Sequence, residues 1–177
     1  MLLTERELWV AIHGIVFGAL FLLVFSAVVL ELYSLRPRWV TQNGMFKSLW
    51  FSKIGTSIMA VVAWLTVITG TYIAYPWYRA TPPKGAADLI DYPRHYLLSI
   101  PNLSPWHTFG MEWKEHVAWF APILATAVAF AVWHAGIKIT ESPKLRNASI
   151  VMLSLAFGAA AIAGLFGAFI TKAAPVL

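Results

Sequence analysis

The stretch LWVAIHGIVFGALFLLVFSAVVL, residues 8–30, decides the fold class of this chain. It contains no Asp, Glu, Lys or Arg, and it is long enough to cross a membrane as a helix, which takes roughly 20 apolar residues. Three similar stretches follow it. The sequence therefore predicts an all-α integral membrane protein, one domain of residues 1–177, folded as a four-helix up-down-up-down bundle with spans at about 8–35, 54–75, 115–137 and 148–171.

Composition supports the membrane class and excludes several kinds of site. Hydrophobic residues make up 59% of the chain and charged residues 12%, against roughly 25% charged residues in soluble domains. The chain has no cysteine, which excludes disulfides, iron–sulfur clusters, thiolate metal sites and covalently attached haem. The net charge of +5 lies mainly in short loops and is not expected to bind nucleic acid. The first residues do not read as a signal peptide, and Thr4 with Glu7 predicts a helix capping box.

Loop charges predict the orientation in the membrane. Basic residues concentrate in residues 36–53 and 138–146, so the positive-inside rule places these two loops in the cytoplasm. Both termini and the loop at 76–115 are then expected on the periplasmic side of a bacterial inner membrane. That loop is rich in proline but also apolar, which predicts an ordered periplasmic loop with a short interfacial helix around 89–98.

Two spans carry polar pairs at the same spacing. His13 and Glu31 are 18 residues apart on the first span, and His116 and His134 are 18 apart on the third. This is five helical turns and a rise of about 27 Å, so each pair lies on one helix face. Parallel spans place His13 level with His116, and Glu31 level with His134. Ionisable side chains inside a membrane are costly, which makes each of them a functional hypothesis.

His13 and His116 are the predicted ligands of a metal, most simply a haem iron near the periplasmic face. An up-down bundle places spans one and three on a diagonal, where a macrocycle fits between two imidazoles more easily than between neighbouring helices. Gly14 and Gly18 leave room for a bulky group beside the first helix. The alternative is that His13 is a buried imidazole bonded to a neighbouring group and His116 is a polar residue at a helix start.

Three more residues are candidates at the same end. His107 lies nine residues before His116, about 180° around a regular helix. It is either an interfacial surface residue or part of a second site, a propionate contact or a quinone pocket. Arg94 and His95 lie in the loop, and they either pair with haem propionates or are solvated.

Glu31 and His134 form a possible inner site. No other histidine lies at the level of His134, so a second bis-histidine haem is not expected. The pair is open to four interpretations: a high-spin haem on His134, a proton relay, part of a quinone site, or a structural pair. Glu31 can also extend toward Arg36 and Arg38. A proton-handling or ion-pair role fits a carboxylate opposite a histidine better than a haem does.

A copper site is the competing inorganic interpretation. His107, Met111, Glu112 and His116 provide ligand types that suit copper, although His116 is expected to point away from the first two. The fourth span is rich in glycine and alanine, and such a face either packs within the bundle or docks a partner subunit.

The arrangement resembles the small four-helix membrane cytochromes b that serve as electron-transfer or anchor subunits of respiratory complexes. The resemblance rests on His13, His116, His134 and the stretch WHTFGMEWKEH, residues 106–116. It implies one non-covalent haem b that relays electrons between a membrane quinol and a redox partner, with any catalysis belonging to the complex. Di-haem members have two histidine pairs, whereas this chain has one complete pair. The alternatives are a haem-free anchor subunit and a periplasmic-side copper-binding membrane protein.

Overall fold

The computed structural model describes residues 3–36 and 41–174. Within these residues the chain is all-α and contains no strand. Four helices in this part are long and apolar enough to cross a membrane: Glu5–Ser34, Asn43–Tyr78, Trp106–Ala135 and Pro143–Ala173. The prediction of an all-α protein with four helices long and apolar enough to span a membrane is confirmed, while the up-down topology, the periplasmic loop and the orientation across the bilayer stay predictions.

The first spanning helix consists of α1 (Glu5–Ala11), the π-helical segment η1 (Ile12–Gly18) and α2 (Ala19–Ser34). The predicted capping box is confirmed, because the Glu7 amide donates to the Thr4 hydroxyl at 3.2 Å and the Thr4 amide donates to the Glu7 carboxylate at 2.7 Å. In η1 the backbone turn is wider than in an α-helix, as the Ala19 amide bonds the Gly14 carbonyl. Single π-turns of this kind are frequent at functional sites.

The second spanning helix consists of α3 (Gln42–Thr69), the π-helical η2 (Gly70–Ala74) and α4 (Tyr75–Tyr78). It begins well before the expected residue 54, because the Thr41 hydroxyl caps it by accepting from the Gly44 amide at 3.3 Å. Lys53 therefore lies within the helix.

The third spanning helix is broken. It consists of the π-helical η3 (Trp106–Met111), α6 (Glu112–His116) and α7 (Phe120–Ala135), with a turn at 117–119. Pro122 lies in the first turn of α7, where its missing N–H costs no helical hydrogen bond. The helix is instead interrupted at 117–119, just before this proline. Because of this break, His116 and His134 do not belong to one regular helix. Their spacing of 18 residues therefore does not place their side chains on the same helix face.

The fourth spanning helix, α9 (Pro143–Ala173), follows the short helix α8 (Lys138–Glu141). Gly136 ends α7 with a positive φ of 52°, a conformation that favours glycine. The loop between the second and third spanning helices contains α5 (Pro93–Ser99), so the expected short helix is present.

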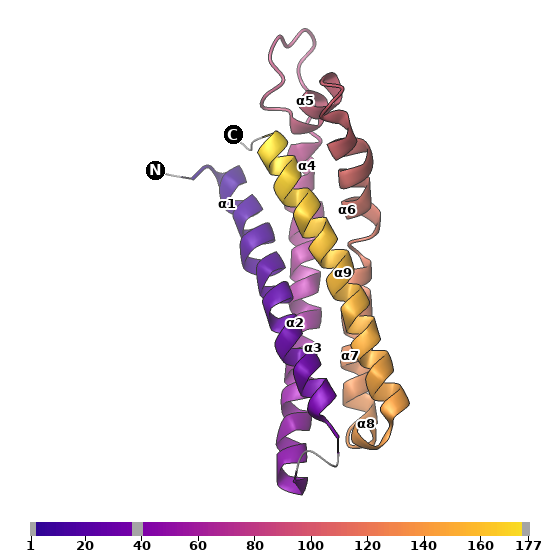
Figure 1. Ribbon diagram of the computed structural model, residues 1–177. Helices are drawn as coiled ribbons and strands as arrows, with labels where there is room; N and C mark the ends of the chain where they lie inside the picture. The colour runs from indigo at the N-terminus through magenta and orange to yellow at the C-terminus, as the bar shows by residue number, and fades with distance from the viewer. Residues whose placement is uncertain (1–2, 37–40, 175–177) are drawn as a thin grey trace.

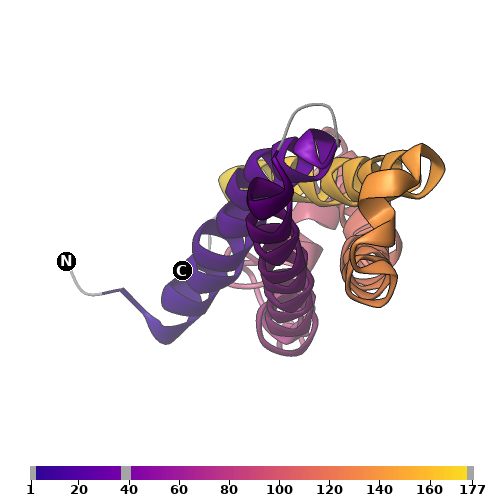
Figure 2. The ribbon, with the colours of Figure 1, turned by 90° about the horizontal axis from the view of Figure 1, so that it is seen from below.

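The spanning helices pack as a ring in the order α2, α3, α7 and α9, with α9 returning to α2 (Figures 1 and 2). The first and third spanning helices therefore lie on a diagonal, as expected. The start of α1, the end of α9 and α5 lie at one end of the molecule, and α8 lies at the other (Figure 1). The main core draws on all four helices, and its largest fully buried side chains include Phe21, Leu32, Met59, Val128 and Leu153.

A second, smaller core closes the end that carries α5. Its buried members are Tyr78, Leu97, Met111, Ile170 and Ala174. Leu97 of α5 is completely buried in it, and burial of one leucine side chain contributes about 1.5–3 kcal/mol. This contact docks the loop helix onto the spanning helices.

The outer surface of the bundle is apolar. Large side chains such as Leu23 and Phe130 are mostly exposed around its circumference, which suits a surface covered by lipid. The small residues of α9 divide between two faces: Ala156, Ala159 and Ala163 are buried within the bundle, whereas Gly164 is exposed.

Candidate functional site

The imidazole of His13, in η1, is held by the second spanning helix. Its Nδ1 lies 2.8 Å from the carbonyl oxygen of Thr66 and 3.4 Å from the hydroxyl of Thr69. A carbonyl oxygen only accepts, so Nδ1 carries the proton and Nε2 is left with a lone pair. No hydrogen bond within the described residues uses Nε2. Histidines that ligate metals commonly donate their other N–H to a backbone carbonyl in this way.

Glycine at position 70 allows the His13 ring to lie against the second helix. A Cβ at Gly70 would lie 2.6 Å from Cε1 of His13 and 3.2 Å from its Nε2, which no side chain tolerates without displacing the ring. Nothing lies within 4 Å of a Cβ placed on Gly14, which is exposed. Gly18 instead faces the second helix, since its Cβ position lies 4.0 Å from Cγ2 of Thr66.

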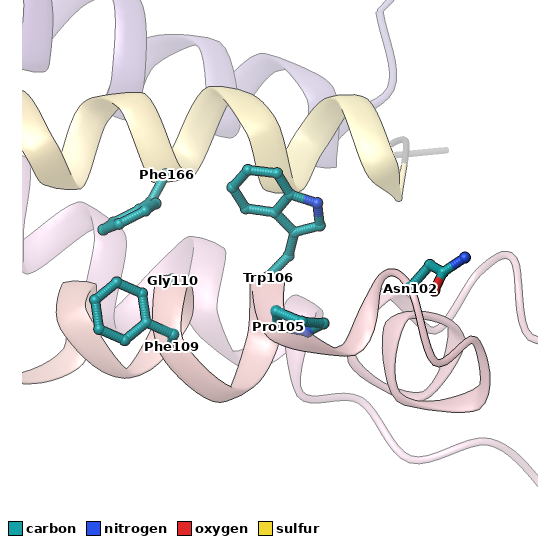
Figure 3. A pocket seen from close by; sticks show the side chains of 6 residues that line it. All are labelled: Asn102, Pro105, Trp106, Phe109, Gly110 and Phe166. Carbon is teal, nitrogen blue, oxygen red and sulfur yellow. The ribbon is translucent and has the colours of Figure 1, made fainter.

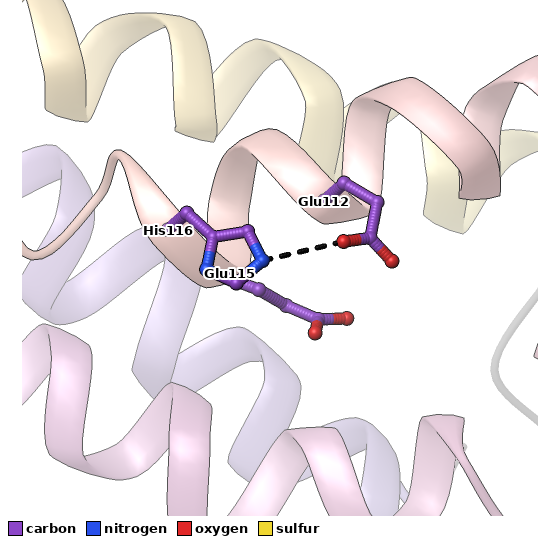
Figure 4. A group of neighbouring side chains, drawn as sticks. All are labelled: Glu112, Glu115 and His116. Atoms are coloured by element: carbon purple, nitrogen blue, oxygen red, sulfur yellow. Dashed lines mark ion pairs between the residues drawn. The ribbon is translucent and has the colours of Figure 1, made fainter.

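His116 is the last residue of α6 and points away from the bundle. Its side chain is 73% exposed, and its Nε2 lies 3.3 Å from a carboxylate oxygen of Glu112, one turn earlier (Figure 4). With Glu115 these residues form a group, the rim cluster, whose three ligand atoms lie within 4.8 Å of one another. Imidazole nitrogen and carboxylate oxygens are metal-ligand types, so the rim cluster can hold a single metal ion.

The two predicted haem ligands therefore have different partners. His13 is bonded to the second spanning helix, and His116 is paired with Glu112 on its own helix. Ligation of one iron by both requires His116 to release Glu112 and turn toward the bundle. The bis-histidine site stays a prediction.

His107 is buried between three elements. His107 is only 7% exposed, so the interpretation that it is an interfacial surface residue is wrong. Nδ1 lies 2.8 Å from the Tyr78 hydroxyl of α4, and Nε2 lies 3.4 Å from Nε of Arg94 in α5. A guanidinium only donates, so Nε2 is the acceptor and Nδ1–H donates to Tyr78. The His107 ring thereby joins the loop helix to the second and third spanning helices.

The two loop candidates differ in their surroundings. Arg94 is engaged with His107 and is not simply solvated. His95, its neighbour, has a buried Nδ1 without a hydrogen-bond partner among the described residues.

A charged contact connects the same region to α6. Arg79 lies 3.9 Å from a carboxylate oxygen of Glu115 and donates a short hydrogen bond to the Tyr75 hydroxyl. That hydrogen bond, with the nearby Glu115 charge, raises the pKa of Arg79 above its ordinary value. The other oxygen of Glu115 is buried and has no hydrogen-bond partner among the described residues.

Lys114 is a charged side chain that sequence reasoning missed. It lies on α6 but extends across to α9, where its Nζ is 3.3 Å from the carbonyl oxygen of Ala163. The sequence contained a signal for a lysine inside the bundle, because Lys114 stands one residue before the span at 115–137. The third spanning helix, Trp106–Ala135, includes it.

The inner candidates do not contact each other within the described residues. The carboxylate of Glu31 accepts a short hydrogen bond from the Ser48 hydroxyl of α3. His134 is exposed and stacks on Phe130 of its own helix, with ring centroids 5.5 Å apart. Arg38, toward which Glu31 was expected to extend, lies outside the described residues. A structural hydrogen bond accounts for Glu31, and a Glu31–His134 relay has no contact to support it.

An aromatic pocket lies between η3 and α9 (Figure 3). Its volume is about 360 Å³. Trp106 stacks on Phe169 at 5.1 Å between centroids, and Phe109 meets Phe166 edge-on at 5.6 Å. The pocket is lined by Asn102, Pro105, Trp106, Phe109, Gly110 and Phe166, so it suits a flat apolar ring or an acyl chain.

The residues of the copper interpretation are divided between two environments. His107 and Met111 are buried, the latter in the smaller core, while Glu112 and His116 lie in the rim cluster. A single ion bound by all four is not supported by these contacts.

Comparison of this chain with known protein families, with curated proteins and with solved structures gives no match. The functional argument therefore rests on the side chains described above.

Proposed function

We propose that this chain is a membrane b-type cytochrome subunit, with one haem b ligated by His13 and His116, that relays electrons between a membrane quinol and a redox partner. The observation that carries the proposal is the hydrogen bond from His13 Nδ1 to the Thr66 carbonyl, which leaves Nε2 as a free ligand atom inside a spanning helix. The haem, when bound, would supply a one-electron couple. The Thr66 contact would fix the His13 ring and increase its basicity.

His13 would hold the haem iron through Nε2, which has no hydrogen-bond partner among the described residues. Nothing lies within 4 Å of a Cβ placed on the neighbouring Gly14. His116 would hold the iron only after giving up its ion pair with Glu112. Loss of this ion pair costs little, because His116 is exposed and surface ion pairs contribute only about 0–1 kcal/mol.

The quinone and the partner subunits belong to the same proposal. The aromatic pocket beside Trp106 is the place for a quinone ring, with Asn102 as its polar contact. The exposed small residues of α9, including Gly164, offer a surface on which another subunit of a respiratory complex can pack closely.

The topology follows from the loop charges. The basic residues of 36–53 and 138–146 are proposed to face the cytoplasm of a bacterial inner membrane. The bundle then runs up-down-up-down, with α5, both termini and the His13 end on the periplasmic side.

The test is a reduced-minus-oxidised optical spectrum of the purified protein. A b-type band is expected in the unmodified protein and in His134→Ala, whose histidine lies on the exposed inner part of α7. The band is expected to be lost in His13→Ala and in His116→Ala. A band that survives His116→Ala but not His13→Ala would assign the second ligand to another residue. The lack of any band in the unmodified protein would leave a haem-free anchor subunit.

A second candidate function is metal binding by the rim cluster, which the 4.8 Å grouping of its ligand atoms favours. Calorimetric titration with Zn²⁺ and Cu²⁺ tests it. Glu112→Gln is expected to weaken binding about tenfold, which corresponds to about 1.4 kcal/mol, while Glu141→Gln, exposed on α8, leaves it unchanged. Equal binding by both variants would exclude the rim cluster.

A further inference from the structure

The two partners of His107 require its imidazole to be neutral. Its Nδ1 lies 2.8 Å from the Tyr78 hydroxyl of α4, and its Nε2 lies 3.4 Å from Nε of Arg94 in α5. A guanidinium nitrogen only donates, so Nε2 must keep its lone pair. Because His107 is buried, a partner that is lost is not simply replaced by solvent.

Protonation of His107 would remove the contact with Arg94. An imidazolium carries an N–H on both ring nitrogens and has no acceptor, so donor would face donor and cation would face cation at Nε2. Histidine ordinarily changes its charge between about pH 5 and pH 8. The contact is therefore present while the ring is neutral and is lost as the pH falls.

No carboxylate among the described residues is paired with the His107 ring to hold it as an imidazolium. The nearest acids along its own helix lie on α6 and face other partners. Glu112 is paired with His116, and Glu115 with Arg79, the residue that follows α4. The guanidinium of Arg94 is thus the charged group in direct contact with the ring.

Two more elements that pack on η3 carry basic side chains. In α5, His95 follows Arg94 and has a buried Nδ1 without a hydrogen-bond partner among the described residues. In α9, Lys172 lies near the same end and is exposed. His95 titrates in the same pH range as His107, so a test has to separate the two histidines.

The end of α5 continues into the aromatic pocket through backbone hydrogen bonds. The Ile100 amide donates to the Leu97 carbonyl at 3.4 Å, and the Trp106 amide donates to the Leu103 carbonyl at 3.0 Å. Asn102, which lines the pocket, lies between these turns. Movement of α5 away from the spanning helices would therefore move one edge of the pocket.

We propose that His107 is a pH-sensitive latch. Its neutral form holds α5, and with it the Asn102 edge of the aromatic pocket, against the spanning helices, and protonation of the ring releases both. The effect on the pocket rests on the proposed function, under which the pocket takes a quinone ring, whereas the latch on α5 does not. Acidification on the side that carries α5 would then weaken quinone binding.

The first measurement is hydrogen–deuterium exchange over residues 93–99 of the full-length protein in detergent, at about pH 8 and about pH 5. Labelling times are corrected for the pH dependence of intrinsic exchange. In the unmodified protein the protection of this segment is expected to fall at least about tenfold at the lower pH, because a buried hydrogen bond to a charged group is lost. Exchange in α7 is expected to stay the same.

Three variants assign this response, each through its own ratio of protection at the two pH values. His107→Gln does not titrate, and its amide can accept from Arg94 and donate to Tyr78, so its protection is expected not to depend on pH. Arg94→Gln can donate to a neutral ring or accept from a protonated one, so the response is expected to be lost there too. His95→Gln is the matched control and is expected to keep the fall.

The second measurement is calorimetric titration with menadione, a quinone without an isoprenoid tail, at the same two pH values. The unmodified protein is expected to bind it at least about tenfold more weakly at the lower pH, in parallel with the release of α5. His107→Gln is expected to bind it equally at both.

The outcomes separate the latch from the proposed function. Protection that does not change with pH in the unmodified protein, or a fall that persists in His107→Gln, refutes the latch. Loss of the fall in His95→Gln assigns the switch to His95 instead. If α5 responds through His107 and menadione binds equally at both pH values, the coupling to the pocket is wrong. If α5 responds and menadione binds at neither pH, the latch on α5 stands and the quinone site of the proposed function fails.

Discussion

His13 Nδ1 lies 2.8 Å from the carbonyl oxygen of Thr66, so the first and second spanning helices are joined by a hydrogen bond inside the bundle. The sequence suggested a partner for His13 on the third helix, at His116. In the structure, the hydrogen bond to Thr66 of the second helix fixes the orientation of the His13 ring. A ligand at His13 would therefore depend on the contact between helices one and two as much as on a second ligand residue.

Gly70→Ala tests this contact. The added methyl group would lie 2.6 Å from Cε1 of His13, so the ring must move and lose its bond to Thr66. Overpacking of this kind costs about 1–3 kcal/mol, and we expect a lower thermal unfolding temperature together with loss of the b-type band. Gly158→Ala, which faces open space, is the matched control. Unchanged unfolding and an unchanged spectrum in Gly70→Ala would show that His13 does not need this position.

His107→Leu is expected to loosen the loop helix α5. The substitution removes the partner of the Tyr78 hydroxyl and of Arg94, and an unsatisfied buried polar group costs about 1–3 kcal/mol. Hydrogen–deuterium exchange over residues 93–99 should increase, while exchange in α7 stays the same. His107→Gln can both accept from Arg94 and donate to Tyr78, so it should retain much of the protection. Equal exchange in the two variants would contradict this role.

Arg146→Met is expected to destabilise the end of the molecule that carries α8. The Arg146 guanidinium is buried and donates to the carbonyl oxygens of Leu35, Ile139 and Thr140 at 3.0, 3.4 and 3.2 Å. It thereby joins the fourth helix to the end of the first. Hydrogen bonds to charged groups contribute about 1.5–3 kcal/mol, so a loss of at least about 2 kcal/mol in the free energy of unfolding is expected. Lys144→Met, at an exposed position two residues earlier, should have little effect.

The proposed orientation can be tested by cysteine labelling, because the chain has no cysteine of its own. Asp88→Cys lies in the loop that carries α5, and Lys144→Cys lies at the start of α9. In intact bacterial cells whose outer membrane has been made permeable, a maleimide that cannot cross the inner membrane should label Asp88→Cys. It should label Lys144→Cys only after the inner membrane is disrupted. The opposite pattern would invert the topology.

Glu31→Gln is expected to leave the haem content unchanged. The carboxylate bonds the Ser48 hydroxyl, and a glutamine amide can keep that contact. The ratio of the b-type band to total protein measures the outcome. A loss of haem in Glu31→Gln, with the fold intact by circular dichroism, would place the site at the opposite end of the bundle from His13.

Much of the fold was predictable from apolar segments, because a spanning helix must be long and uncharged whatever it packs against. The residues at which the helices begin were harder to predict from the sequence. The second helix begins at Gln42 because Thr41 caps it, well before the expected residue 54, and the third includes Lys114 and the acids beside it. Charges in these stretches are accommodated by contacts across the bundle, which hydropathy along one chain segment does not record.

The candidate site was predictable only in part. Residue type and position predicted histidines gathered at the loop end, and the alternative in which His13 bonds a neighbouring group agrees with its contacts to Thr66 and Thr69. The particular partners of His13, His107 and His116 were not predictable. The reason is geometric: the π-helical turns of η1 and η3 and the break at 117–119 change the angle per residue. A prediction that assumes 100° per residue therefore assigns side chains beyond these points to the wrong helix face.

The sequence by itself determined that the chain is helical, that four segments can cross a membrane and that ionisable groups gather near one end, because these follow from the cost of polar groups in lipid. Only the tertiary structure decided which of these groups meet. It placed His13 on Thr66, buried His107 between Tyr78 and Arg94, and enclosed Lys114 beside Gly167. These contacts join residues far apart in the chain, and they depend on how irregular helices pack, which the order of residues does not reveal.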